Sequence, residues 1–415
     1  MGICEPTAAV VRWGYIQKQR EEIMAHSDTQ STASLGANLA GSQRPLRQAS
    51  HVPGYIYSAP EVLEREKEAF FLQDWLYVGR IEELAHPGDY MTWRIAGEPI
   101  IIARDTQSTL RAFYNMCLHR GVEVAAGQGN RRSFKCPYHG WVYDLTGQLT
   151  GAAYMQESLG FDVSQCRLRP LGVDVWAGNI FVTFNPTPPP LAEFSTEFEQ
   201  DFSFLRPQDC RLGNKIRLDL GCNWKLVSEN LMDFYHVGVL HANSFGAKFS
   251  WDDEHVHLKA RGGLTIWYNA APPTPGGEPL FGKMPWLADQ PLSFACTGFL
   301  APNLTLFGRI DCVRLMTVWP QTVDTCTFLI YHLFPEEFFT RPDFEKNRQI
   351  YHDYQIQVLE EDRSMIQSLQ QAMGTRGFVP GRMSTLEKPI HNYLNAYLDR
   401  VFGPEAGATG GRDAG

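Results

Sequence analysis

The sequence predicts an α+β protein, in which an N-terminal all-β domain precedes a C-terminal α+β domain whose antiparallel sheet is flanked by helices. Short apolar segments such as residues 100–103 and 179–184, separated by Gly, Asp and Pro, indicate β-structure in the first half. Beyond residue 190, helical and strand-like patterns are mixed, which is typical of an α+β domain. We expect helices at residues 223–240 and 343–373, and strands at residues 263–269, 303–308, 312–319 and 325–334.

The domain boundaries are predicted from composition. Residues 1–51 are rich in small and polar side chains, have little to bury, and are expected to form a poorly ordered extension, with Met24 as an alternative start. A lead-in helix is expected next, with Ser58 as its N-cap. The proline-rich run at residues 185–190 is stiff and predicts a linker. The expected units are therefore the lead-in helix at 52–75, the all-β domain at 76–190, the α+β domain at 191–403 and a flexible tail at 404–415.

Composition excludes several classes of function. The 415 residues include 46 acidic and 37 basic side chains, and the net charge of −9 argues against broad binding to nucleic acid or an anionic membrane. No apolar run approaches the ~18 residues that cross a bilayer. The N-terminus lacks the apolar core of a secretory signal, so we expect a cytoplasmic protein. Most of the nine cysteines are scattered singly and are interpreted as small buried hydrophobes.

Two Cys–His pairs form the first chemical motif. Cys117 and His119 are followed, after a gap, by Cys136 and His139. Two Cys and two His could bind zinc tetrahedrally, or a two-iron cluster with the thiolates on one iron and the imidazoles on the other. A common zinc finger pairs Cys with Cys and His with His, whereas each pair here is mixed. The spacing therefore favours the [2Fe–2S] cluster.

The residues around these pairs resemble a known family. Cys117-x-His119, then Cys136-x2-His139-Gly140-Trp141, resembles the Rieske domain of ring-hydroxylating oxygenases. Gly140 would allow a sharp backbone turn beside the cluster, and Trp141 could shield it from water. The resemblance extends over residues 53–403 and implies the α (oxygenase) subunit of that family.

A second motif predicts a mononuclear iron site. His236 and His241 are spaced i, i+5, so they can converge on one metal only if the helix ends or bulges between them, which Gly238 makes plausible. Two His and one carboxylate form the facial triad that leaves open positions on Fe(II). The segment from Asn223-Trp224-Lys225 through Glu229-Asn230 to Asp233-x2-His236-x4-His241 resembles the family's catalytic entry helix, and gives Asn230 a pocket role.

The carboxylate ligand is expected to be Asp362. An apolar stripe through Val358 and Ile366 indicates the buried face of a helix, and Asp362 falls on it. A charge there is costly unless it is paired or metal-bound. Glu361 is interpreted as a solvated charge on another face. The family comparison agrees, because the stretch around Asp362 resembles the one that holds the family's Asp ligand.

The resemblance assigns a different role to Asp233. In the family the two centres of one chain lie too far apart for electron transfer, and a head-to-tail trimer brings a neighbour's cluster close. Asp233 would then bridge His236 of one subunit to His139 of the next, holding both imidazoles in orientation. The alternative is an Asp that acts only within its own chain. A homotrimer is therefore expected, with or without a small β subunit.

Weaker motifs complete the list of candidates. Arg309 and Arg314 could anchor a carboxylated substrate, although pairing with Asp311 is the ordinary interpretation. His255 and His257 are interpreted as part of a polar loop. No dinucleotide-binding fingerprint occurs, so an NAD(P)H-dependent reductase, with or without a ferredoxin, must supply electrons. Pocket candidates close to the metal residues in sequence are Leu231, Met232, Val237, Leu240 and Phe245.

The expected function is that of the terminal oxygenase of a multicomponent Rieske system, a cytoplasmic oxidoreductase with a [2Fe–2S] cluster and Fe(II). It would use O2 to mono- or dihydroxylate an aromatic, possibly carboxylated substrate, as in aromatic hydrocarbon catabolism. Family branches that oxidise quaternary amines often carry Glu at the place of Asp233, which favours the aromatic substrate. The alternatives are a monooxygenase or demethylase of a small N-methyl or quaternary amine, an electron-transfer Rieske protein, and a zinc-dependent binding module.

Overall fold

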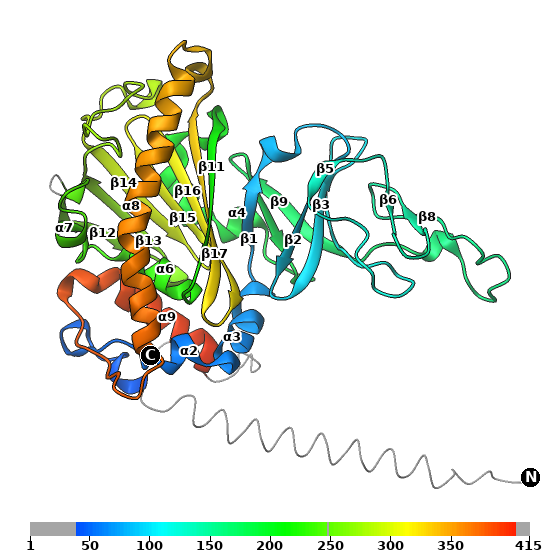
Figure 1. Ribbon diagram of the computed structural model, residues 1–415, viewed down its shortest axis with the longest axis horizontal. Helices are drawn as coiled ribbons and strands as arrows, with labels where there is room; N and C mark the ends of the chain where they lie inside the picture. Colours follow the sequence, from blue (N-terminus) through cyan, green and yellow to red (C-terminus); the bar gives the residue numbers. More distant parts are fainter. Residues whose placement is uncertain (1–38, 247–248, 404–415) are drawn as a thin grey trace, which may run out of the picture.

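A computed structural model describes residues 39–246 and 249–403, and Figure 1 shows a β-rich part beside a larger part in which helices cover a sheet. The predicted N-terminal extension lies largely, and the predicted tail entirely, outside the described residues. The α+β fold with antiparallel sheets is confirmed, because every strand pairing within the named sheets is antiparallel. No helix among the described residues is long and apolar enough to span a membrane.

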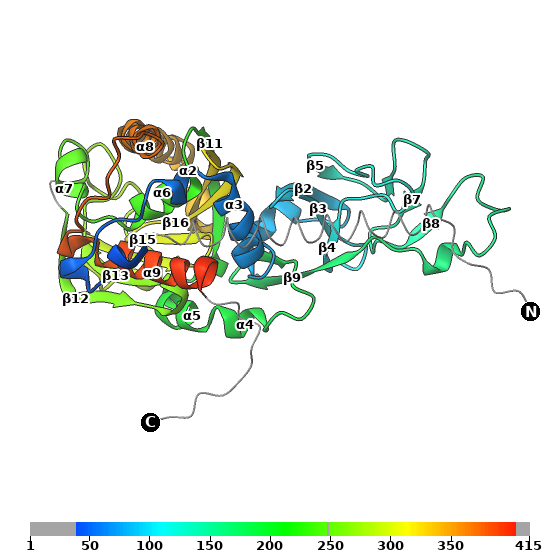
Figure 2. The same cartoon turned by 90° about the horizontal axis from the view of Figure 1, so that it is seen from below.

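The β-rich part contains two sheets. The larger has the order β1-β10-β9-β4-β3-β2-β5, and the smaller has the order β6-β7-β8. The bounds of the strands are β1 Leu76–Arg80, β2 Asp89–Ile95, β3 Glu98–Arg104, β4 Leu110–Tyr114, β5 Gln128–Asn130, β6 Phe134–Lys135, β7 Val142–Tyr143, β8 Leu149–Gly151, β9 Pro170–Trp176 and β10 Asn179–Thr183. The small sheet lies at the end of this part that is remote from the helices (Figures 1 and 2).

The second part is built on a seven-stranded sheet of order β11-β17-β16-β15-β14-β13-β12. Its strands are β11 Cys210–Leu220, β12 Ser250–Leu258, β13 Leu264–Asn269, β14 Phe294–Leu300, β15 Leu304–Arg309, β16 Val313–Thr322 and β17 Thr325–Pro335. The four strands expected here are present, whereas β11, β12 and β14 were not expected. The residues that were interpreted as a polar loop around His255 and His257 belong to β12.

Helices cover this sheet and connect it to the lead-in segment. They are α2 Tyr55–Ser58, α3 Pro60–Glu66, α4 Leu191–Phe194, α5 Thr196–Phe202, α6 Trp224–Met232, α7 Val237–Leu240, α8 Phe344–Met373 and α9 Lys388–Phe402. The expected helix at 343–373 is confirmed as α8. The lead-in helix expected after Ser58 is present as α3 and a π-helical turn at Lys67–Phe71 that continues it, but its N-cap is Ala59 rather than Ser58, and the separate helix α2 before it was not expected. The residue before a proline rarely adopts helical backbone angles because it would clash with the proline ring, and this explains the break between α2 and α3.

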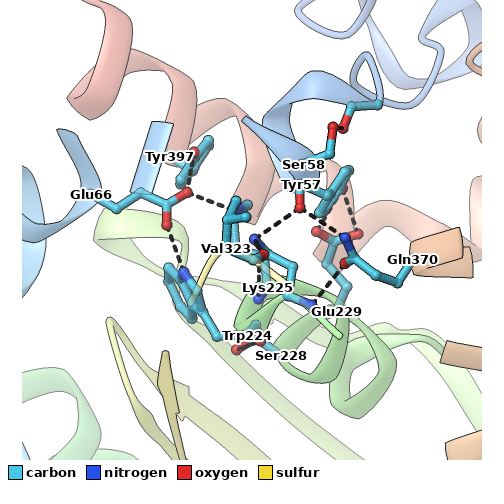
Figure 3. Close-up of polar contacts among 12 residues, drawn as sticks. Tyr57, Ser58, Glu66, Trp224, Lys225, Ser228, Glu229, Val323, Gln370 and Tyr397 are labelled. Atoms are coloured by element: carbon cyan, nitrogen blue, oxygen red, sulfur yellow. Dashed lines mark hydrogen bonds and ion pairs between the residues drawn. The ribbon is translucent and has the colours of Figure 1, made fainter. Parts of the chain in front are cut away.

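A buried polar network holds α6 in place (Figure 3). The Glu66 carboxylate on α3 accepts hydrogen bonds from Lys225 Nζ at 2.5 Å, Trp224 Nε1 at 2.7 Å and the Tyr397 hydroxyl of α9 at 2.6 Å. The side chains of Glu66 and Lys225 are fully buried. Three helices that are distant in sequence are thus tied together at the first turn of α6, the helix that leads to Asp233, His236 and His241.

The two parts share one continuous core, which fixes their arrangement. Tyr77 on β1 packs edge-on against Tyr331 on β17, with ring centroids 5.5 Å apart. The backbone of Tyr77 also exchanges hydrogen bonds with the Asn303 side chain, which accepts at 3.1 Å and donates at 3.0 Å. Apolar residues of both large sheets belong to the same buried cluster. The small sheet has a separate core around Cys117 and Cys136.

Candidate metal centres

The two histidines of the second motif flank the short helix α7, which follows α6. The expected helix at 223–240 is wrong, because α6 ends at Met232 and Asp233 is extended, with φ −85° and ψ 109°. His236 then precedes the short helix α7, and His241 follows it. Gly238 is inside α7, so the interruption lies before His236 rather than at the glycine. The two imidazoles lie close together, with ring centroids 5.1 Å apart, and the chain leaves the helical conformation at His241, where ψ is 17°.

His236, His241 and Asp362 meet at one point. Asp362 Oδ1, from the middle of α8, lies 3.1 Å from His241 Nε2 and 3.6 Å from His236 Nε2. Ligand atoms of these three residues lie within 4.8 Å of one another, and no other such group occurs in residues 39–246 and 249–403. Asp362 Oδ1 is buried and has no hydrogen-bond partner in the described part of the chain. A buried, unsatisfied carboxylate oxygen facing two imidazole nitrogens fits a divalent metal with two His and one carboxylate.

Carboxylates also contact the far side of each imidazole. Glu361 Oε2 lies 2.7 Å from His241 Nδ1 and accepts a hydrogen bond from Ser244 Oγ at 2.9 Å. Asp233 Oδ2 lies 3.0 Å from His236 Nδ1. The Glu361 contact is a hydrogen bond of the kind that fixes the ring orientation and the tautomer of a metal-binding histidine, whereas Asp233 and His236 lie within ion-pair distance without hydrogen-bond geometry. The interpretation of Glu361 as a solvated charge is therefore wrong. Glu361 precedes Asp362 on α8 and lies about 100° around the helix from it, which brings its carboxylate to the other side of the His241 ring.

The charges around His236, His241 and Asp362 favour binding of a cation. Burial opposes protonation of His241, but the carboxylates of Asp362 and Glu361 outweigh burial and raise its pKa. The same negative surroundings stabilise a bound metal ion. The residues present therefore fit a mononuclear iron site in both geometry and charge.

A cavity of about 90 Å³ opens beside these three side chains. Four residues expected near it from the sequence line its wall: Asn230, Leu231, Val237 and Phe245. Met232 is wrong as a pocket residue because it is fully buried in the main core, and Leu240 does not line the cavity either. The remaining wall comes from distant segments that local spacing could not identify, including Phe249, Tyr268, Phe307, Met316 and Val358.

Arg309 and Arg314 also line this cavity, side by side on one face of the sheet. Phe307 pairs with Arg314 across β15 and β16, so alternation puts Arg309 and Arg314 on the same face. Their exposed fractions are 4% and 6%. The expected pairing with Asp311 is wrong, because Asp311 accepts a hydrogen bond from the Tyr351 hydroxyl and forms no ion pair with either arginine.

The four residues of the first motif lie on two matching turns. Gly121 donates its backbone N–H to Cys117 O at 2.8 Å, and Gly140 donates to Cys136 O at 3.1 Å. Both glycines have positive φ, 76° and 74°, a conformation that favours glycine. Each turn therefore presents one thiol inward and one imidazole outward. Trp141 is buried and stacks on the His119 ring at a centroid distance of 5.1 Å.

In these two turns the imidazoles lie together on one side and the thiols lie together on the other. His119 Nδ1 and His139 Nδ1 approach to 3.1 Å at an exposed edge. Cys117 and Cys136 are buried behind them, and the Tyr143 hydroxyl lies 3.3 Å from Cys117 Sγ and accepts from Leu118 N–H at 3.0 Å. The four atoms do not gather around one point as the mononuclear site does. This layout fits a two-iron cluster better than a single tetrahedral zinc.

Comparison with known families agrees with both centres. Residues 74–167 match the Rieske [2Fe-2S] domain, and residues 207–403 match the ring hydroxylating alpha subunit (catalytic domain). The carnitine monooxygenase oxygenase subunit of Acinetobacter pittii (strain PHEA-2) is 30% identical over 336 residues, which cover 79% of this chain and 86% of the relative. The glycine betaine monooxygenase oxygenase subunit of Pseudomonas aeruginosa (strain UCBPP-PA14) is 25% identical, covering 90% and 96%.

Solved structures show the same fold. The quaternary ammonium Rieske monooxygenase CntA in complex with γ-butyrobetaine is 24% identical, with a TM-score of 0.70, covering 86% of this chain and 97% of that one. Naphthalene 1,2-dioxygenase from Rhodococcus sp. is 20% identical, with a TM-score of 0.69, covering 85% and 94%. The matched domains imply a Rieske cluster and a mononuclear iron. The chain therefore belongs to the Rieske non-haem iron oxygenases, as an oxygenase (α) subunit.

Proposed function

We propose that His236, His241 and Asp362 hold Fe(II), and that Cys117, His119, Cys136 and His139 hold the [2Fe–2S] cluster. The observation that carries this proposal is the buried Asp362 Oδ1, which has no hydrogen-bond partner in the described residues and faces both imidazoles. The iron would supply O2 activation, and the cluster would supply electrons one at a time. Glu361 and Asp233 would hold the imidazoles in orientation, and the apolar wall of the cavity would exclude water.

We also propose that electrons arrive from a neighbouring subunit in a head-to-tail homotrimer. The small sheet with Cys136 and His139 is remote from α6 and α7 in both views (Figures 1 and 2). The His139 side chain is exposed, and Asp233 borders both the cavity at His236 and a second cavity of about 230 Å³. A carboxylate there could contact His236 and receive a neighbour's His139. An NAD(P)H-dependent reductase, with or without a ferredoxin, would reduce the cluster, and a small β subunit is compatible with this assembly.

For the substrate, we propose a small N-methyl or quaternary amine. The curated relatives include oxygenase subunits of carnitine, glycine betaine and choline monooxygenases. Several aromatic rings line the cavity, and such rings attract quaternary ammonium groups through their negative faces. The expectation of aromatic hydrocarbon catabolism receives less support, since two buried guanidinium groups in the wall do not suit a hydrocarbon. The Asp at position 233, which from the sequence alone favours an aromatic substrate, therefore does not determine the proposed substrate class.

Oxidation of such an amine would insert one oxygen atom of O2 into a C–H bond next to nitrogen, with two electrons and two protons reducing the other atom to water. The hydroxylated carbon would then release an amine and an aldehyde. The test is to purify the protein, measure its iron, and supply NADH with a surrogate reductase. We expect about three irons per chain, a Rieske paramagnetic resonance after reduction, and aldehyde formation from an amine. About two irons per chain would instead indicate an electron carrier.

Asp362→Ala separates the two iron sites in the same experiment. The variant should keep the visible spectrum of the cluster and hold about two irons per chain, because only the mononuclear site loses a ligand. Asp353→Ala on the same helix is the control, since Asp353 is largely exposed and contacts only His352 and Gln349, both on α8, among the described residues. Full activity in Asp362→Ala would refute the ligand assignment.

A further inference from the structure

The cavity beside the predicted iron site contains two positive charges that no group in the described part of the chain neutralises. The Arg309 and Arg314 side chains are almost fully buried, yet neither forms an ion pair within the described residues. Arg309 Nη1 donates to Gly308 O at 3.0 Å, and Arg314 Nη1 donates to Gln355 Oε1. The Nε atoms of both arginines are buried without a partner in this part of the chain.

Burying two unpaired charges of the same sign costs folding free energy, so the presence of Arg309 and Arg314 in one wall of the cavity requires an explanation. A guanidinium carries five N–H donors, and most of those on Arg309 and Arg314 are unused among the described residues. Burial and the nearby Arg309 charge lower the pKa of Arg314 to about 10, which still leaves it protonated at neutral pH. The two charges therefore persist and repel each other until an anion lies between them.

The carboxylates that line the cavity are already engaged elsewhere. Asp233 contacts His236, and Asp362 faces both histidines. Neither lies within ion-pair distance of Arg309 or Arg314, although all four line one cavity. The cavity consequently has an acidic end at the histidines and a basic end at β15 and β16.

We propose that Arg309 and Arg314 form a carboxylate-binding subsite, so that the substrate is an amine that also carries a carboxylate. This inference rests on the proposed function and specifies its substrate class. The planar guanidinium groups match the two oxygens of a carboxylate. The substrate's carboxylate would lie between the arginines, and its methylated nitrogen would point towards aromatic rings such as Phe245 and Phe249. Phe307 stacks below both guanidinium groups, at 5.7 Å and 5.3 Å from ring centroid to Cζ, and keeps them in place.

The test compares matched ligands on the iron-loaded, oxidised protein by anaerobic calorimetry. The probes are γ-butyrobetaine, glycine betaine and benzoate, each beside its primary amide, which has the same shape without the charge. We expect at least one carboxylate to bind ten or more times as tightly as its amide, because a charge-assisted pair is worth about a factor of 10 to 100. Absence of binding by every carboxylate up to about 10 mM would overturn the proposal.

Two variants and a control assign the effect to the arginines. Arg309→Gln and Arg314→Gln should each weaken carboxylate binding about tenfold or more and leave amide binding nearly unchanged. Arg217→Gln is the control, because Arg217 lies on the exposed side of β11, paired with Asp219. Equal loss of carboxylate and amide binding in the variants would indicate a merely structural role and overturn the subsite.

The same ligand set distinguishes this subsite from the proposed function. The difference between each carboxylate and its amide reports on the subsite alone. The difference between the amines and benzoate, measured as oxidation with a surrogate reductase, reports on the substrate class. Oxidation of benzoate but not of the amines, with the carboxylate preference intact, would refute the amine substrate and retain the subsite.

Discussion

Glu361 Oε2 lies 2.7 Å from His241 Nδ1, on the side of the imidazole ring opposite the nitrogen that faces Asp362. Neighbouring residues of α8 thus contact the two nitrogens of one histidine. Asp362 lies at the predicted metal site, and the Glu361 carboxylate favours the tautomer of His241 that carries its proton on Nδ1. Helix α8 therefore supplies both a ligand and the group that orients another ligand.

Glu361→Gln is expected to weaken the mononuclear iron site without affecting the cluster. The amide would hydrogen-bond His241 more weakly than the carboxylate does, and loss of such a contact typically lowers metal affinity about 10- to 100-fold. Iron retained after dialysis against a chelator measures the effect, and the visible spectrum reports the cluster. Glu360→Gln is the matched control, since within the described residues Glu360 is exposed and pairs with Arg363 alone. Equal retention of iron in both variants would contradict an orienting role for Glu361.

Asp233→Asn is expected to retain both iron centres and to lose most turnover, about 10- to 100-fold, because the amide lacks the charge and the second acceptor oxygen with which the carboxylate would bridge two imidazoles. Steady-state oxidation with a surrogate reductase measures turnover, and iron analysis verifies that the centres are intact.

Mixed trimers test whether electron transfer crosses subunits. Cys136→Ser removes a cluster ligand, whereas Asp233→Asn leaves the cluster and disables the acceptor side. Co-expression of the two variants should restore activity, because a subunit with an intact cluster can supply a neighbour with an intact Asp233. If the co-expressed mixture stays as inactive as either variant alone, Asp233 acts only within its own chain.

Stability is expected to depend on pH through Glu229. Burial raises the pKa of Glu229 to about 7, although the Tyr57 hydroxyl donates to its carboxylate at 2.8 Å. The folded protein then holds a proton that the unfolded chain releases above its ordinary pKa of 4.5, so stability falls as the pH rises from about 4.5 to about 7. Over this range Glu229→Gln should remove up to about 3 kcal/mol of the pH dependence. Urea unfolding across the pH range measures it, with Glu64→Gln at the surface as the control.

Lys225→Met is expected to destabilise the protein by about 3–5 kcal/mol, because it leaves Glu66 charged and buried with only the donors of Trp224 and Tyr397. Lys215→Met is the control, since Lys215 is partly exposed where it pairs with Glu83, and such pairs contribute about 1 kcal/mol or less. Chemical denaturation of both variants gives the comparison. Similar losses of stability in both variants would show that the buried Lys225–Glu66 pair contributes no more than the partly exposed Lys215–Glu83 pair.

The sequence by itself determined the two metal motifs and the fold class. Cys117, His119, Cys136 and His139 lie on two short turns, so their spacing defines the geometry within each turn. His236, His241 and the buried position of Asp362 were likewise predictable, because a charge on an apolar helix stripe requires compensation. Four strands of the second sheet, β13, β15, β16 and β17, were also predicted from their β patterns.

Only the tertiary structure decided which distant residues share the cavity. Arg309 and Arg314 face it because of the register between β15 and β16, and Glu361 reaches His241 because α8 packs against the loop after α6. The break after Met232, before His236 rather than at Gly238, was likewise not marked by any local pattern in the sequence. Local spacing encodes contacts within a turn, but contacts between strands and helices depend on packing over long sequence separations, which no local pattern specifies.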